Sequence, residues 1–462
     1  MQHLLRFGLL LWLGVLLQSS LPAQDSLRLD LEACIAYALD HNPTVQNARF
    51  DTYIAQAQVK EVMASGYPQV NGTVDLQYFP SLPTTILPGD FNPVVDPVTG
   101  ETRPGDPLEV RFGFPWQSTA GIGINQLFFD GTFFIGLKGA RTYEELSIRA
   151  ADRTREETAL AVSQAYFQAL MAKEQLALID ANLLRVRKLF TETRALNEAG
   201  FAEKIDVDRL QINLTNLELE REKIDRFVVL ARTLLKFQMG MPVDQPLALK
   251  GSVSELAEAP APPLSLGDLD PTNRVEYRLL QTQERIEQYN TQRIRAGYLP
   301  SLYGFSNMQV NAQRDAFDFF DTNQKWFPIV VMGFQLNVPI FDGFRKRAQV
   351  QQSQLELRKI RNQFDQFALS MQVEVQTAYH KMQDAYNTVQ ATQANVELAR
   401  RVYEVAEIKY REGVGSSLEI NDAESQLKQA EANYLNGMYQ YLMAELELQK
   451  ARGEFSRYHQ EE

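Results

Sequence analysis

Apolar and polar residues alternate in two segments of the first half of the chain, the pattern of strands with one apolar face. In residues 69–78 one face carries Val70, Gly72, Val74, Leu76 and Tyr78, and the other carries Gln69, Asn71, Thr73, Asp75 and Gln77. In residues 116–127 one face carries Trp116, Ala120, Ile122 and Ile124, and the other carries Gln117, Thr119, Gly121, Gly123 and Asn125. This alternation predicts either the wall of a water-filled barrel or a half-buried sheet of a soluble protein.

The second half of the chain repeats this pattern less regularly. Tyr303 and Phe305 fall on the polar face, whereas the apolar face is formed by Met308, Val310, Met332, Phe334, Leu336 and Val338. Aromatic residues gather near the strand ends, as they do at membrane–water interfaces: Tyr67, Tyr78, Phe79, Trp116, Phe128, Phe129, Tyr298, Trp326 and Phe341. The strand lengths are near the ~9–11 residues that cross a bilayer when tilted. Transmembrane strands are therefore favoured, and an ordinary sandwich sheet is the alternative.

Long helical segments with a seven-residue repeat follow the strands. No proline or glycine lies between Gly343 and Gly413, so a helix there would be roughly 100 Å long. Two positions of its heptads form the predicted core stripe. The first is occupied by Val375, Met382, Val389, Val396 and Tyr403, and the second by Ala378, Ala385, Thr392, Ala399 and Ala406. After the glycine, Ile420, Leu427, Tyr434, Tyr441 and Leu448 alternate with Ala423, Ala430, Gly437, Ala444 and Ala451. This predicts long antiparallel coiled-coil helices, in a tube or in a simple stalk.

The chain contains an internal repeat. Residues 66–68 (GYP) correspond to 297–300 (GYLP), 126–131 (QLFFDG) to 338–343 (VPIFDG), and 198–201 (EAGF) to 411–414 (REGV). The offset is 343 − 131 = 212 at the second marker and 413 − 200 = 213 at the third. The two offsets differ by only one residue, which indicates two copies of one structural plan.

The repeat gives the following domain boundaries. Repeat 1 covers 24–240, with a helix, a strand at 68–79, an external loop at 80–114, a strand at 115–129 and a helical hairpin with its tip near residue 200. A Pro- and Ala-rich linker covers 241–263. Repeat 2 covers 264–453, with a helix, a strand at 300–312, an external loop at 313–326, a strand at 327–341 and a hairpin tip near 413. A tail covers 454–462.

Four strands cannot close a membrane barrel, because the smallest such barrels have about eight. An open sheet in lipid would leave two edges without hydrogen-bond partners. Transmembrane strands therefore require oligomerisation, and three copies would supply twelve strands. The predicted fold class is an α+β membrane protein with a β-barrel built from several chains, 12-stranded if there are three, and with long α-helices in a tube or a stalk.

The N-terminus predicts export, and the composition argues against several classes of function. Arg6, the apolar residues 7–17 and the sequence Leu21-Pro22-Ala23 predict a signal peptide at 1–23, and an N-terminal anchor helix is the alternative. The net charge of −12 argues against nucleic-acid binding. One cysteine and four histidines make a metal or catalytic centre improbable. Cys34 is expected to be a small buried side chain in the first helix.

Three motifs resemble the outer-membrane efflux family typified by TolC. They are 31–43 (LEACIAYALDHNP), similar to its opening helix, 338–343 (VPIFDG), similar to its strand-to-helix junction, and 413–423 (GVGSSLEINDA), similar to its second periplasmic hairpin. The resemblance covers essentially the whole mature chain. It implies a homotrimer with a 12-stranded β-barrel in the outer membrane of a Gram-negative bacterium, in contact with outer-membrane lipid, and with an α-helical barrel extending into the periplasm. It also implies a periplasmic adaptor (membrane fusion) protein and an inner-membrane pump of the RND or ABC type, with no cofactor and no enzymatic activity.

The resemblance also implies roles for several residues. The two tip turns would dock the adaptor: Gly200, Phe201 and Ala202, and Gly413, Val414 and Gly415. Glu419 and Asp422 would ring the pore constriction, with helix capping as the alternative role. Asp206 and Tyr410 match members of the polar latch that holds the tip shut. The arginine position of that latch falls on Gly415, so the clasp must differ, with Arg411 or Lys204 as candidates.

The predicted function is the exit duct of a tripartite efflux or type I secretion system, which conducts substrates passively. The alternative is an exported trimeric coiled-coil structural protein or adhesin, which accounts for the heptads but not for the amphipathic strand pairs. The sequence leaves open the exported substrate and the role of the loop at 80–114.

Overall fold

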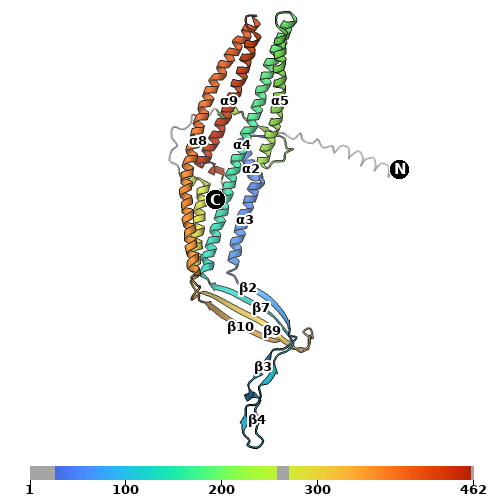
Figure 1. Ribbon diagram of the computed structural model, residues 1–462, viewed down its shortest axis with the longest axis vertical. Helices are drawn as coiled ribbons and strands as arrows, with labels where there is room; N and C mark the ends of the chain where they lie inside the picture. Colours follow the sequence, from blue (N-terminus) through green and yellow to red (C-terminus); the bar gives the residue numbers. More distant parts are fainter. Residues whose placement is uncertain (1–26, 258–269, 459–462) are drawn as a thin grey trace, which may run out of the picture. The chain divides into compact units, whose positions relative to one another are not determined.

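The computed structural model describes residues 27–257 and 270–458, which form two compact units (Figure 1). The first unit contains the described residues up to Tyr53, residues 145–282 and the residues from Ile360 onward. The second unit contains residues 54–144 and 283–359. The predicted signal peptide, 1–23, lies outside the described residues.

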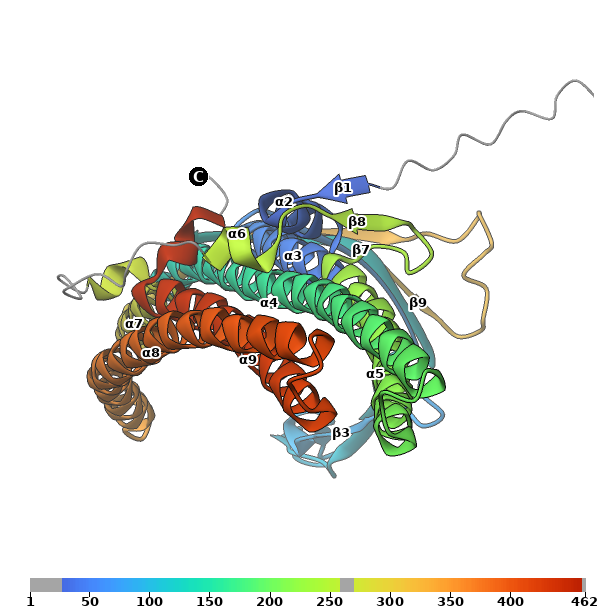
Figure 2. The same cartoon turned by 90° about the horizontal axis from the view of Figure 1, so that it is seen from above.

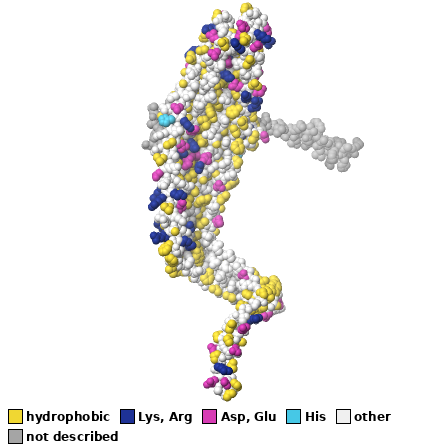
Figure 3. Space-filling view, in the orientation of Figure 1, with side chains coloured by type: hydrophobic (Ala, Val, Ile, Leu, Met, Phe, Trp, Pro, Cys, Tyr) yellow, Lys and Arg dark blue, Asp and Glu magenta, His cyan; other side chains and the backbone are white. Residues whose placement is uncertain are grey.

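The second unit contains a four-stranded antiparallel sheet. Its strands are β2 (Gln69–Tyr78), β7 (Trp116–Phe129), β9 (Ser301–Arg314) and β10 (Phe327–Asn337), in the order β10-β9-β7-β2. The register pairs Val74 with Ala120 and Ala120 with Val310, and it pairs Thr73 with Gly121 and Gly121 with Gln309. The predicted apolar and polar residues therefore lie on opposite faces, because side chains that pair directly point to the same side. Charged side chains are sparse over the sheet (Figure 3).

The two aromatic residues on the polar face fit local features of the sheet. Phe305 pairs with Gly333, and its ring lies where a side chain of residue 333 would be. The Tyr303 hydroxyl donates a hydrogen bond to Asp130 Oδ2 at 3.2 Å. β10 ends at Asn337, four residues before the predicted end at 341. Pro339 follows closely and has no N–H to continue the ladder.

The segment predicted as an external loop, 80–114, contains regular structure. β3 (Thr84–Leu87) pairs with β6 (Leu108–Arg111), and β4 (Val94–Val95) pairs with β5 (Thr102–Arg103). A 3₁₀ turn, η1 (Gly89–Phe91), lies between β3 and β4. The sequence did not predict these strand pairs within the external loop, because strands of four and two residues carry too little alternation to be recognised in a sequence.

Two helical hairpins make up most of the remaining chain. The first consists of α4 (Gly131–Glu198) and α5 (Lys204–Met239), and the second of α8 (Arg345–Arg411) and α9 (Ser417–Arg452). The shorter helices are α2 (Leu31–His41), α3 (Pro43–Ala64) and α7 (Val275–Ala296). The opening helix is divided at Asn42, which takes an extended conformation before Pro43.

The predicted heptad positions form the helix contacts of the first unit. Val375, Ala378, Met382 and Ala385 on α8 are buried, as are Ile420, Ala423, Leu427 and Tyr441 on α9. A side chain on Gly437 would lie 3.4 Å from Thr392 Oγ1 and 3.5 Å from Thr388 Cγ2. The small residues thus let α8 and α9 approach closely. Within this unit, α2, β1 (Leu27–Leu29), β8 (Leu247–Leu249) and α6 (Val253–Ala257) lie on one side of the helical layer (Figure 2).

The segment predicted as a linker, 241–263, is partly structured. β8 pairs in parallel with β1, and α6 follows it; residues 258–263 lie outside the described residues. A short helical turn, η2 (Pro271–Asn273), precedes α7, and the predicted tail begins with η3 (Glu454–Tyr458), in which Phe455 is buried. Cys34 is fully buried in α2, as predicted, and burial, reinforced by the charge of Asp30, raises the pKa of its thiol to about 12.

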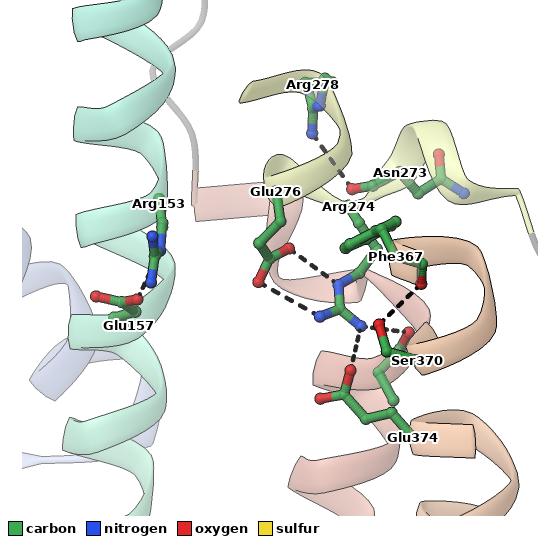
Figure 4. A network of polar contacts seen from close by, with 10 residues as sticks. Arg153, Glu157, Asn273, Arg274, Glu276, Arg278, Phe367, Ser370 and Glu374 are labelled. Carbon is green, nitrogen blue, oxygen red and sulfur yellow. Dashed lines mark hydrogen bonds and ion pairs between the residues drawn. The ribbon is translucent and has the colours of Figure 1, made fainter. Parts of the chain in front are cut away.

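A buried arginine joins three helices of the first unit (Figure 4). Arg274, 5% exposed, donates hydrogen bonds to Glu276 at 3.1 Å, to Glu374 at 3.1 Å and to the carbonyl of Ala451 at 3.0 Å. Burial alone would raise the pKa of Glu276, but the hydrogen bonds and charge of Arg274 outweigh it and hold that pKa below its usual 4.5. The N-terminus of α7 is thereby fixed to α8 and to the end of α9.

Replacing Arg274 with alanine is expected to lower the free energy of unfolding by roughly 3 kcal/mol, the lower end of the usual range because the two glutamates are partly exposed. Because the pKa of Glu276 is lowered on folding, the contribution of the pair is present at neutral pH and lost as the pH falls below about 4.5. Chemical denaturation at pH 7 and pH 4 measures both effects. Arg226→Ala, which removes an exposed ion pair with Glu222, is the control, and an equal loss in both variants would contradict the prediction.

Candidate functional site

The candidate site is formed by the turns that close the two hairpins and by the helix ends beside them. Gly200 and Gly413 have φ angles of +85° and +75°, a conformation that glycine adopts without strain. Backbone hydrogen bonds close the turns: Phe201 N donates to Leu196 O at 2.8 Å, and Val414 N donates to Lys409 O at 3.0 Å. Each helix therefore ends at a glycine that reverses the chain.

Each turn presents one large apolar side chain to solvent. Phe201 is 82% exposed and Val414 is 79% exposed. Ala202 is half-buried, and its carbonyl accepts a hydrogen bond from Asn197 Nδ2 at 2.7 Å. These two exposed apolar side chains occupy equivalent positions in the two hairpins.

Gly415 has no room for a side chain. A Cβ atom at this position would lie 2.9 Å from Lys409 Cβ and 3.0 Å from Tyr410 N. The family resemblance assigns a latch arginine to position 415. The last turn of α8 occupies the space that its side chain would need. A clasp of this tip must use other residues.

The two predicted constriction residues differ in their surroundings. Glu419 forms an ion pair with Lys409 at 3.0 Å, and its backbone N–H is capped by Ser416 Oγ at 3.1 Å. Asp422 is exposed and accepts a hydrogen bond from Gln426 Nε2 at 2.8 Å. Glu419 therefore has a cationic partner, whereas the side-chain partner of Asp422 is a neutral amide.

The two predicted latch residues have different partners. The Tyr410 hydroxyl shares a buried hydrogen bond with Thr193 Oγ1 at 2.8 Å, and Asp206 lies 3.8 Å from Arg209. Within the described residues no hydrogen bond joins Asp206 to Tyr410. Burial raises the pKa of Tyr410, and the charge of Asp206 adds to this, whereas the hydrogen bond with Thr193 lowers it.

Five polar contacts link the first hairpin to the second near their tips, and we call them the inter-hairpin clasp. They are Thr193–Tyr410 at 2.8 Å, Glu192–Arg411 at 3.4 Å, Lys188–Glu407 at 3.4 Å, Arg185–Glu431 at 2.8 Å and Glu220–Lys428 at 2.6 Å. Arg411 is thus one of the two candidates that the sequence suggested. The partners on α4 and α8 are separated by 411 − 192 = 219 and 407 − 188 = 219 residues. These separations are close to the 212- and 213-residue offsets of the internal repeat. That repeat is the one sequence signal that could have identified the partners in the clasp.

A buried carboxylate lies between the hairpins in the same region. Glu424 is 2% exposed, and its Oε1 atom has no hydrogen-bond partner. Burial raises the pKa of Glu424, and the charge of Arg185 and a hydrogen bond from Asn213 offset this only in part. Sequence reasoning missed this residue because a glutamate in a heptad segment is usually exposed.

The sheet has two open edges. β2 and β10 are the outer strands, and both are almost entirely exposed along their length. Large apolar side chains cover one face of each, including Val74 at 78% and Phe334 at 73% exposure. Long edge strands with an apolar face are normally paired with another strand or covered by another part of a protein.

Among the described residues, no helix is both long and apolar enough to cross a membrane. No group of three or more histidine, cysteine, aspartate or glutamate side chains in that part of the chain is arranged to hold a metal ion.

The chain matches the family model for outer membrane efflux proteins over residues 34–223 and 277–454. It is 24% identical over 297 residues to the proteases secretion protein PrtF of Dickeya chrysanthemi, covering 63% of each chain and thus less than two thirds of that relative. It is 25% identical over 332 residues to the pyoverdine export outer membrane protein OpmQ of Pseudomonas putida, covering 70% of this chain and 68% of OpmQ.

The fold is similar to that of solved channel proteins. A crystal structure of CusC superposes with a TM-score of 0.73 at 17% identity, covering 94% of this chain and 95% of the other. The open state of the MtrE outer membrane channel of Neisseria gonorrhoeae superposes with a TM-score of 0.67 at 16% identity, covering 92% of this chain and 88% of the other. Long helical hairpins and a small sheet are common to this fold.

Proposed function

The chain belongs to the outer membrane efflux protein family, whose members are outer-membrane channels rather than enzymes, and we propose that it is the exit duct of an efflux pump or a type I secretion system. The observation that carries this proposal is the four-stranded sheet with one polar face, one apolar face and two unpaired edges. Such a sheet is suited to lipid on one side and water on the other.

Three copies of the chain would complete the duct. The open edge of β10 would pair with β2 of the next copy, so that three sheets close a 12-stranded barrel without a free edge. The helical hairpins would close into a periplasmic tube in the same way. Substrates would pass through the lumen without chemical change, delivered by an inner-membrane pump through a periplasmic adaptor. Copurification of tagged protein with an adaptor and a pump from native membranes, and loss of export on deletion of the gene, test this proposal.

The exposed tip residues are proposed to dock the adaptor. Replacing Phe201 and Val414 with serine should leave the trimer intact and reduce export at least tenfold, because apolar anchors at the centre of an interface carry much of its binding energy. Site-specific crosslinking to the adaptor and an export assay measure the two effects. Leu184→Ser, at an exposed apolar position away from the turns, is the control, and normal export in the double variant would exclude docking at these side chains.

The proposed constriction is formed by Glu419 and Asp422 from three chains. Because Lys409 partly neutralises Glu419, we expect Asp422 to carry most of the cation preference. Asp422→Asn should lower the cation-to-anion permeability ratio severalfold, and Glu419→Gln should change it less. Reversal potentials in asymmetric salt measure this ratio. A larger effect of Glu419→Gln would contradict the expected ranking, and no change in either variant would argue for the alternative role in helix capping.

The same geometry supports a gate at the tip. The inter-hairpin clasp holds α8 and α9 against α4 and α5 with a buried hydrogen bond and several ion pairs. We propose that this clasp keeps the periplasmic end closed at rest, in place of a latch between Asp206 and Tyr410. Opening would separate the hairpins and break these contacts.

A further inference from the structure

A basic groove lies between α7 and α8 in the second unit, apart from the tip. Its volume is about 760 Å³. Three cationic side chains line it, Arg293 from the last turns of α7, and Arg345 and Lys346 from the start of α8. No role for this groove follows from the gate or from the adaptor-docking turns.

The groove continues from the polar face of the sheet. Tyr303, on that face, donates a hydrogen bond to Asp130, and the same carboxylate caps the start of α4 by accepting hydrogen bonds from the backbone N–H and the hydroxyl of Thr132. Thr132 lines the groove, and it lies beside Gly297 together with Lys346. If the polar face of the sheet lines the lumen, these contacts connect the groove to the lumen side through Asp130 and Tyr303.

Two acidic residues, Glu287 and Glu356, also line the groove, and within the described residues neither forms an ion pair with Arg293 or Arg345. Glu356 is paired with Lys359 at 2.9 Å, and Lys346 is paired with Asp342 at 3.4 Å. Arg293 donates to the neutral Asn290 at 3.1 Å, and within the described residues neither Arg293 nor Arg345 forms an ion pair. Two guanidinium groups thus remain available to a ligand.

The wall of the groove is held in place by a buried hydroxyl chain. Thr291 Oγ1 and Ser353 Oγ share a hydrogen bond, and Ser353 donates to Glu287 Oε1, which also accepts from Asn290. Asn290 is in turn the partner of Arg293. The Arg293 guanidinium is therefore positioned by contacts that connect α7 to α8.

We propose that this groove binds the oxyanion group of solutes that pass through the duct, such as a phosphate, sulfate or carboxylate. Guanidinium groups form two parallel hydrogen bonds with such groups. Three copies would form a ring of anion sites in the lumen, distinct in sign from the acidic residues at the tip. The inference rests on the proposed function, because it requires the polar face to line a water-filled duct.

Single-channel recording with inorganic phosphate as the probe tests the proposal. Phosphate should block the current of the unaltered channel, and the double variant Arg293→Gln/Arg345→Gln should weaken this block about tenfold or more and raise the cation-to-anion permeability ratio. The control Arg295→Gln/Arg347→Gln removes the same charge from exposed neighbours that do not line the groove, and its block should match that of the unaltered channel.

The possible outcomes distinguish a failure of the groove inference from a failure of the proposed function. Equal block in the groove variant and the control would overturn the groove inference while leaving the duct intact. Unchanged conduction, with loss of a copurifying phospholipid from the groove variant alone, would overturn it in favour of a lipid site on the outer surface. Absence of any channel in the unaltered protein would overturn the proposed function and this inference together.

Discussion

Replacing Val74 with arginine is expected to abolish the trimer in the outer membrane, whereas replacing its neighbour Thr73 with arginine is expected to leave the trimer in place. Val74 lies in the middle of β2 on the apolar face and pairs with Ala120, which in turn pairs with Val310. An arginine on the lipid side of a barrel costs about 2–4 kcal/mol near the membrane centre. Three copies would therefore cost roughly 6–12 kcal/mol, comparable to the stability of a whole domain.

Thr73 is a matched control because it lies on the same strand and the opposite face. Its register partner is Gly121, so a longer side chain at residue 73 meets no side chain directly across the strand pair. Heat-modifiable migration of outer-membrane fractions measures both variants. Equal loss of the trimer in the two variants, or loss only with Thr73→Arg, would contradict the assignment of the faces.

The triple variant Tyr410→Phe/Arg411→Ser/Lys188→Ser is expected to convert the channel from a closed to an open resting state. The buried hydroxyl pair with Thr193 contributes about 1 kcal/mol, and the two sets of ion pairs about 0.5 kcal/mol each. The closed state would therefore lose about 2 kcal/mol of stabilisation per chain, or about 6 kcal/mol for three chains that open together. This would shift the ratio of open to closed channels by a factor of roughly 10⁴.

Conductance in planar bilayers is the measurement, and we expect the triple variant to show a severalfold larger unitary conductance. Arg194→Ser is the control, because it removes an ion pair with Glu198 within α4 and leaves the contacts between the hairpins unchanged. If both variants conduct like the unaltered channel, the inter-hairpin clasp does not hold the tip closed.

The sequence predicted most of the fold because its two patterns are local. Alternation at Val70, Val74 and Leu76 requires only that one strand face lipid or a core. The heptad positions from Val375 to Ala406 specify a helix pair in the same way. The glycines at 200 and 413 indicated the tip turns, and both have positive φ angles that few other residues tolerate.

Other features depend on contacts that no local pattern reveals. The pairing of β8 with β1 joins residues 247–249 to residues 27–29, so the segment looked like a linker in isolation. The partners in the inter-hairpin clasp are also far apart in sequence, as in the pair of Thr193 with Tyr410. The family resemblance suggested Asp206 and Tyr410 as a latch, but Gly415 left the partner undetermined, and only the packing of α4 against α8 identifies Thr193.

The central claim is that three chains form one channel, and the mass of the native complex after mild detergent extraction tests it most directly. Native mass spectrometry is expected to give three times the mass of the processed chain, for the same preparation that conducts ions in planar bilayers. The open edges of β2 and β10 require that several chains close one barrel, since lipid offers no partner for their backbone groups, and three chains would supply twelve strands. A conducting preparation with the mass of a single chain would contradict the account.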